Sequence, residues 1–375
     1  MVARTVLDAI INALELGRTA IAWQFVQFAL SLLMAMCYTG GMKNDVTRRN
    51  FLLSSTALAA VAGCTTAKAN GKTEGLPAQF STDLPISKES GIRVRFLGSG
   101  AAGWKPELAK NPHTRRQSSV LIENKVLIDF TMCSFDKLPA GCRPEVLFQT
   151  HSHGDHYNPK AAVKSGVKRM YVQETWADAA REEVGKAAEK LGLPAPEVIG
   201  LPFGKPVVEC GMRFTGVPAN HSTSRVTNGV LERTSVYLVE KGASRLLYAT
   251  DTGGLMGDAA RMIGIDPHIT ARRSALRAAA GSFVHEPQAL TAFIMEATDG
   301  DSDEDFRLFV HSSVQTVSRI VNMLIKYGRL ALPTGQHAYI THLGLKYRDW
   351  PSEKIEKELP DTLRAAYDGL EVVLG

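Results

Sequence analysis

The sequence predicts an α/β protein whose layered body is covered by helices on both outer faces. Short apolar runs typical of strands recur between residues 92 and 341. Segments with apolar residues at intervals of three and four, typical of helices, lie between several of them. Strands interleaved with helices favour stacked sheets under helical covers, although a doubly wound sheet fits the same pattern.

The N-terminal segment is predicted to direct the chain rather than to belong to the fold. Residues 1–41 contain an apolar run that is marginal for a membrane span, so they are either a membrane segment or lie upstream of true initiation at Met42. Residues 42–64 resemble a twin-arginine export signal, with Arg48 and Arg49 before an apolar stretch. The stretch ends at Cys64, which resembles the acylated cysteine of a lipoprotein.

Residues 65–91 have the composition of a flexible linker, and residues 92–375 are predicted to form one domain. The arrangement predicts a periplasmic or cell-envelope protein that contacts the membrane through its N-terminal segment. Removing residues 1–63 takes away five Lys or Arg and three Asp or Glu, which lowers the net charge from +5 to +3. A charge this small argues against nucleic acid as a partner.

Three cysteines fall within the predicted domain, and no two of them form a C-x-x-C pair. We expect free thiols, with a disulfide between Cys133 and Cys142 as the alternative and Cys210 left over.

The elements of the domain follow from local patterns. Apolar runs predict strands at 92–97, 119–123, 126–130, 146–150, 169–172, 234–239, 245–249, 292–296 and 338–341. Helical periodicity is clearest at 175–191 and 313–327.

A glycine-rich turn follows the first predicted strand and matches the dinucleotide-binding pattern G-x-G-x-x-G between Gly98 and Gly103. That motif requires a helix to begin at its third glycine. Trp104-Lys105-Pro106 follows instead, and Pro112 comes soon after, which prevents a long helix from starting there. We therefore interpret the glycines as a tight turn beside an active site.

Four metal-binding side chains lie in six residues directly after the strand predicted at 146–150. The run is His151-Ser152-His153-Gly154-Asp155-His156. A loop at a strand end can fold several ligands around one point, and imidazole and carboxylate are both ligands of zinc. The run therefore predicts a metal site.

This run resembles the H-x-H-x-D-H signature of the metallo-β-lactamase superfamily, and the resemblance implies an αββα sandwich. It implies two divalent metal ions, zinc first and manganese or iron as alternatives. Three further candidate ligands follow in chain order, two of them just after predicted strands. By the resemblance, His151, His153 and His221 hold one ion, Asp155, His156 and His342 hold the other, and Asp251 bridges them. Two such ions share a hydroxide that can attack an ester.

Further motifs resemble the tRNA 3′-processing endonucleases and the cyclic phosphodiesterase of phosphonate breakdown. They are Phe96-Leu97-Gly98-Ser99-Gly100, Glu296-Ala297-Thr298 and His311-Ser312-Ser313. In these relatives a histidine at the position of His311 assists phosphodiester cleavage, which a proton donor can do. The catalytic candidates are therefore Asp155, His311 and Glu296.

The leading hypothesis is an exported metal-dependent phosphodiesterase that acts on a small anionic ester. A stretch with Arg272, Arg273 and Arg277 is either a basic lid for such a substrate or a solvated helix face. One alternative is a lactone or carboxylic-ester hydrolase with the same metals. Another is a non-catalytic binding or cofactor-pathway lipoprotein, similar to the superfamily member of pyrroloquinoline quinone biosynthesis.

Replacing Arg48 and Arg49 by lysine should leave the protein in the cytoplasm, because the paired arginines define this export signal. Cell fractionation with an antibody to the folded domain measures the distribution. If the double variant is still exported and processed at Cys64, the signal is not of the twin-arginine type.

Overall fold

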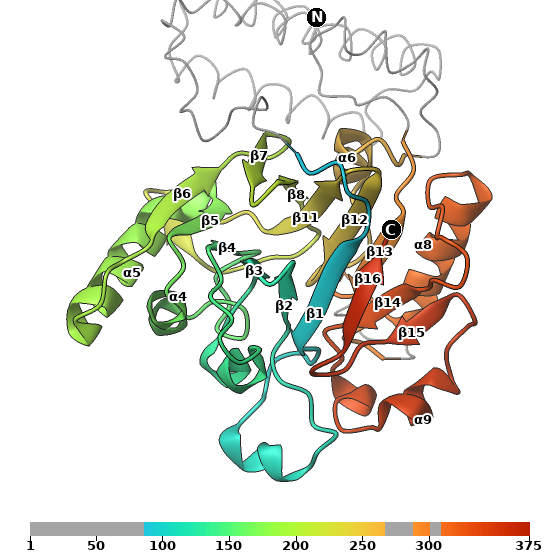
Figure 1. Cartoon of the computed structure of the whole chain (residues 1–375), viewed down its shortest axis with the longest axis horizontal. Coiled ribbons are helices and arrows are strands. Elements are labelled where there is room, and N and C mark those ends of the chain that lie inside the picture. The colour runs from blue at the N-terminus through green and yellow to red at the C-terminus, as the bar shows by residue number, and fades with distance from the viewer. Residues whose placement is uncertain (1–85, 267–287, 301–308) are drawn as a thin grey trace, which may run out of the picture. The chain divides into compact units, whose positions relative to one another are not determined.

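The structure, a computed structural model, describes residues 86–266, 288–300 and 309–375 (Figure 1). The predicted export segments 1–41 and 42–64, most of the linker 65–91, and Arg272, Arg273 and Arg277 lie outside the described residues. Within the described ranges, no helix has the length and apolar character that crossing a membrane requires. Cys133, Cys142 and Cys210 are free thiols.

Two seven-stranded sheets form the centre of the described fold. The first has the order β16-β1-β2-β3-β4-β5-β6. Its strands are β1 Ile92–Gly98, β2 Ser119–Ile122, β3 Val126–Ile128, β4 Val146–Phe148, β5 Arg169–Gln173, β6 Glu197–Leu201 and β16 Glu371–Leu374. The neighbours from β3 to β6 are parallel, and the pairs at the β16 end are antiparallel.

The second sheet has the order β15-β14-β13-β12-β11-β8-β7. Its strands are β7 Pro206–Glu209, β8 Met212–Pro218, β11 Ser235–Lys241, β12 Ser244–Ala249, β13 Ala292–Glu296, β14 Ala338–Thr341 and β15 Leu363–Ala365. The neighbours from β12 to β15 are parallel, and those from β7 to β12 are antiparallel. A separate hairpin, β9 Val226–Thr227 with β10 Val230–Leu231, lies outside both sheets.

The described helices cover the outer faces of the two sheets (Figure 1). They are α4 Pro159–Ser165, α5 Ala177–Leu191, α6 Gly257–Met262, α8 Val314–Lys326 and α9 Ser352–Glu356. Helices α4 and α5 pack on the first sheet, whereas α6, α8 and α9 pack on the second. This is the predicted αββα sandwich, and the fold prediction is confirmed.

Alternating residues of each strand separate the core into three apolar layers, because successive side chains of a strand point to opposite faces. On β4, Phe148 lies between the sheets and Leu147 faces α4 and α5. On β13, Ile294 lies between the sheets and Phe293 faces α8. Strands buried on both faces explain why these segments are continuously apolar in sequence.

The strand directions bring the candidate ligands to one edge of the sandwich. Parallel neighbours end at the same edge, so β12 and β14, which flank β13, both finish there. Because β11 is antiparallel to both β8 and β12, the end of β8 also reaches that edge. The main chain of Ser235 bonds to that of Thr150, at 2.9 Å, which joins this edge to the end of β4.

Phe148 is a central contact between the sheets, and its truncation should weaken the fold. Its ring stacks on Phe214 at 4.3 Å and Tyr171 at 4.7 Å between centroids, and it is fully buried. We expect Phe148→Ala to lower the free energy of unfolding by about 3–5 kcal/mol. Phe309→Ala, at a 78% exposed position, should change it by less than about 0.5 kcal/mol. Urea unfolding measures both, and similar losses would contradict this assignment of the core.

Candidate metal centre

The structure brings the seven sequence-predicted ligands together at the edge where the two sheets meet. The loop after β4 supplies His151, His153, Asp155 and His156, whereas His221 follows β8, Asp251 follows β12 and His342 follows β14. Their donor atoms form two groups, each with all its atoms within 4.8 Å of one another. The groups are His151, His153, His221 and Asp251, and then Asp155, His156, Asp251 and His342. Asp251 belongs to both.

A pocket of about 390 Å³ opens onto these donors. It is lined by Ala101, Ala102, His153, Asp155, His221, Asp251, Thr298, His311, His342, Gly344 and Arg348. Side chains from both sheets and from the glycine-rich turn therefore surround one space.

The donor atoms face one another at short distances around a common space. His156 Nε2 lies 3.0 Å from His342 Nε2, and His221 Nε2 lies 3.2 Å from His153 Nδ1. His151 Nε2 is buried without a hydrogen-bond partner, although Asp251 Oδ2 is 3.1 Å away. Convergent imidazole and carboxylate lone pairs at this spacing fit divalent cations.

Burial keeps one histidine of the first group neutral. His151 is completely buried, and burial, with a smaller contribution from His156, lowers its pKa to about 3. A neutral imidazole keeps the lone pair that a metal requires.

The outward-facing nitrogens of three imidazoles are fixed by hydrogen bonds. His156 Nδ1 contacts Asp129 Oδ2 at 2.7 Å, and His342 Nδ1 contacts Thr298 Oγ1 at 2.7 Å. His221 Nδ1 lies 3.0 Å from the carbonyl oxygen of Val310. Such contacts orient the rings, so that the opposite nitrogen faces the centre.

Three of the residues that build this edge have a left-handed backbone. The φ angles of Asp129, Asp251 and His342 are 54°, 45° and 52°. Non-glycine residues rarely adopt this region, and each such residue costs on the order of 1–3 kcal/mol. The surrounding hydrogen bonds and packing offset this cost. In return, the left-handed backbone turns the side chains of these strand-end residues toward the centre.

His311 and Glu296, the other catalytic candidates, form a pair next to the centre. His311 Nδ1 lies 3.2 Å from both carboxylate oxygens of Glu296. Burial lowers the pKa of His311, but the hydrogen bond and charge of Glu296 outweigh it and raise the pKa to about 9. His311 lines the pocket, whereas Glu296 is fully buried behind it and also accepts from the main chain of Thr252.

Two buried carboxylates that the sequence analysis did not identify hold the ligand loop. Asp129 accepts from Thr150 N at 2.8 Å as well as contacting His156. Glu232 accepts from the main chain and the hydroxyl of Ser152, inside the histidine run. Asp129 directly follows the apolar strand β3, which is the one local signal that marks it.

Two positions of the glycine-rich segment, Gly98 and Gly100, pack too closely to carry a side chain. A Cβ on Gly98 would lie 2.0 Å from the carbonyl oxygen of Gln117, and one on Gly100 would lie 2.8 Å from Arg115 Cβ. The short 3-10 helix Pro106–Lys110 follows, not a long α-helix. The prediction that no long helix follows the glycines is confirmed, and Ala101 and Ala102 line the pocket. Gly100 forms β-bridges with Gln117 and Leu343, so the segment has a bend at Ala102 instead of the predicted tight turn.

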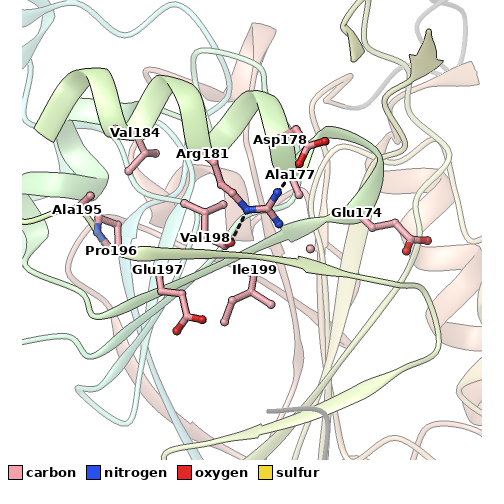
Figure 2. Close-up of a pocket in the computed structure, with 12 residues that line it drawn as sticks. Glu174, Ala177, Asp178, Arg181, Val184, Ala195, Pro196, Glu197, Val198 and Ile199 are labelled. Atoms are coloured by element: carbon pink, nitrogen blue, oxygen red, sulfur yellow. Dashed lines mark hydrogen bonds and ion pairs between the residues drawn. The ribbon is translucent and has the colours of Figure 1, made fainter. Parts of the chain in front are cut away.

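A larger hollow, of about 670 Å³, lies between α5 and β6 (Figure 2). Arg181 extends from α5 across it, and its Nε donates to the carbonyl oxygen of Val198 at 3.0 Å. Strand β6 is the edge of its sheet, so Arg181 covers an otherwise available acceptor. The hollow contains none of the histidine clusters of the described residues, and we assign it no catalytic role.

Asp129 and Asp251 should influence metal binding in different ways. We expect close to two divalent ions per wild-type chain and a reduced metal content in Asp251→Ala. Asp129→Asn should keep all donors but weaken metal affinity about 10- to 100-fold, because the orientation of His156 is loosened. Elemental analysis and chelator competition measure these effects.

Asp178→Asn, at a side chain that is 64% exposed, is the matched control and should bind metal as the wild type does. Carefully prepared wild-type protein that contains no zinc, manganese or iron would contradict the assignment of a metal centre.

Comparison with known proteins agrees with this architecture. Residues 137–277 match the family model of the β-lactamase superfamily domain. A metal-dependent hydrolase of Thermofilum pendens is 30% identical over 127 residues, which cover 33% of this chain and 46% of that protein. The chain thus matches less than half the length of this curated relative.

Solved structures show the same fold at low identity. The metallo-β-lactamase fold protein YhfI from Bacillus subtilis has a TM-score of 0.50 and 13% identity, covering 76% of this chain and 100% of that chain. Zinc-bound PqqB from Methylobacterium extorquens has a TM-score of 0.52 and 14% identity, covering 75% and 99%. Residues 137–277 are thus similar to the β-lactamase superfamily domain, and the chain has the metallo-β-lactamase fold.

Proposed function

We propose that this chain is a metal-dependent hydrolase that cleaves phosphodiesters in the cell envelope. The name of its Thermofilum pendens relative supports metal-dependent hydrolysis, and so does the convergence of seven metal donors, five of which line one pocket. The choice of phosphodiesters depends on one further observation, the pair formed by His311 and Glu296 at the pocket wall.

The donors fit two divalent cations. In this proposal His151, His153 and His221 hold the first, Asp155, His156 and His342 hold the second, and Asp251 contacts both. When bound, such cations supply Lewis acidity and a nucleophilic hydroxide near neutral pH. Zinc suits this mixture of imidazole and carboxylate best, with manganese and iron as alternatives.

His311 is the proton donor in this proposal. Glu296 holds Nδ1, which leaves Nε2 as the ring nitrogen that faces the substrate. Hydrolysis forms a bond from oxygen to phosphorus and breaks the bond to the departing alcohol, whose oxygen takes the proton of Nε2. Glu296 stabilises the charged imidazole but does not line the pocket, so its role is to position His311.

The proposal includes a location and a substrate class. Residues 42–64 direct the chain to the envelope, where lipidation of Cys64 attaches it to the membrane. There it acts on a small anionic ester, since its modest positive charge does not suit nucleic acid.

The leaving group distinguishes the proton-donor role from a structural one. His311→Ala should slow cleavage of a dialkyl phosphodiester about 10²–10⁴-fold, because an alkoxide needs a proton as it departs. Cleavage of bis(p-nitrophenyl) phosphate should fall much less, since nitrophenolate is stable without one. The measurement is kcat/KM for both substrates, together with metal content, which should not change.

His113→Ala, at an exposed position, is the control and should affect neither substrate. Equal losses on both substrates would mean that His311 is structural. Absence of phosphodiesterase activity together with rapid lactone opening would favour a lactone or carboxylic-ester hydrolase instead.

A further inference from the structure

We infer that Arg348 recognises a second anionic group on the substrate, remote from the phosphodiester that is cleaved. The inference rests on the proposed function and narrows its substrate class. It predicts a diester whose retained portion ends in a carboxylate or a phosphate.

Arg348 is the only lysine or arginine among the described residues that line the pocket of the metal centre. It follows β14 and His342 by a few residues, just after the 3-10 helix Leu345–Tyr347. Its side chain is 34% exposed, so it lies at the entrance rather than in the core. The remaining ionisable lining residues are the candidate ligands and His311.

The guanidinium of Arg348 is oriented by one neighbour on one edge. Its Nε and Nη2 donate to Asp349 Oδ2 at 3.2 and 3.0 Å. The other oxygen of Asp349 accepts from Thr114 Oγ1 at 2.8 Å, which fixes the carboxylate. The Nη1 end extends over the glycine-rich turn, 3.5 Å from the position of a Cβ on Gly103. The edge formed by Nη1 and Nη2 can thus bind a carboxylate or a phosphate through two parallel hydrogen bonds.

The backbone that carries Arg348 is held by a second, buried arginine. Arg115 is 3% exposed, and its Nη1 donates to the carbonyl oxygens of Tyr347 at 2.9 Å and Trp350 at 2.8 Å. The main-chain N–H of Arg115 also donates to the carbonyl oxygen of Arg348 at 3.3 Å. A side chain on so constrained a segment loses little further freedom on binding a ligand.

The charges in the pocket explain why a second anion needs its own partner. Cations held at the proposed centre would be balanced by Asp155, Asp251, hydroxide and the phosphodiester, so they would leave little positive charge for a second anion. A second anion would therefore need a positive partner of its own at the entrance. Arg348 supplies that group, and its pairing with Asp349 engages only its Nε and Nη2 atoms.

Four diesters with the same p-nitrophenolate leaving group and different tails test this inference. The tails are 2-carboxyethyl, 2-phosphoethyl, propyl and choline, which are anionic, anionic, neutral and cationic. In the metal-loaded wild type, an anionic tail should give the highest kcat/KM. Arg348→Met should lower kcat/KM for that substrate about 10- to 100-fold, as expected for a lost charge-assisted hydrogen bond. The neutral and cationic tails should change less than about threefold.

Arg213→Met is the matched control, because Arg213 is 33% exposed, has the carboxylate partner Glu240, and lies on β8 outside the pocket lining. It should leave all four values unchanged, and thermal unfolding should show both variants folded. A carboxylate preference over phosphate, or the reverse, identifies which anion the edge binds.

The two ways of failing are distinct. If the wild type cleaves the diesters but Arg348→Met lowers all four equally, or none, the recognition role of Arg348 is wrong and the proposed function stands. If the wild type cleaves no diester, the proposed function is wrong and this inference fails with it.

Discussion

The hydrogen bonds of one buried carboxylate, Asp129, support the whole candidate centre. Its oxygens accept from Gln149, Thr150 and His156, so it binds the end of β4 and one of the candidate ligands together. A buried carboxylate without partners would be costly, and here every contact is to a group that the ligand loop needs. Together with Glu232, which accepts from Ser152, this carboxylate fixes the path of the loop.

The centre is also a product of strand direction. The first sheet supplies the histidine run, and the second supplies His221, Asp251 and His342 from three strands that end at one edge. Left-handed backbone at Asp251 and His342 turns the chain sharply where each strand ends. The backbone strain at these residues therefore accompanies the convergence of their side chains, a pattern common at functional sites. The apolar layer between the sheets keeps the two halves in register.

The sequence predicted those parts of the fold that have local signals. Strand β13 is an almost unbroken apolar run, β1 alternates apolar residues with Arg93 and Arg95, and six of the seven ligands lie in the histidine run or follow a predicted strand. Strands β6 and β8 escaped prediction because Gly200 and Gly216 interrupt them. The close packing of α5 favours glycine at position 200, where a Cβ would lie 3.2 Å from Ala177 Cβ. The sequence analysis did not identify the roles of Glu232, Arg115 and Arg348. Their partners are distant in sequence, and only the fold brings them together.

The division of the ligands between two sheets has a consequence for the stability of the loaded protein. Cations held between residue 151 and residue 342 would act as cross-links that close very long loops of the chain. Closing long loops restricts the unfolded ensemble most, as it does for disulfides. The three cysteines of the described domain form no such bond. In an oxidising compartment, the metal centre would therefore stabilise the fold as disulfides do in many secreted proteins. Loss of metal would then destabilise the sandwich as well as stop catalysis.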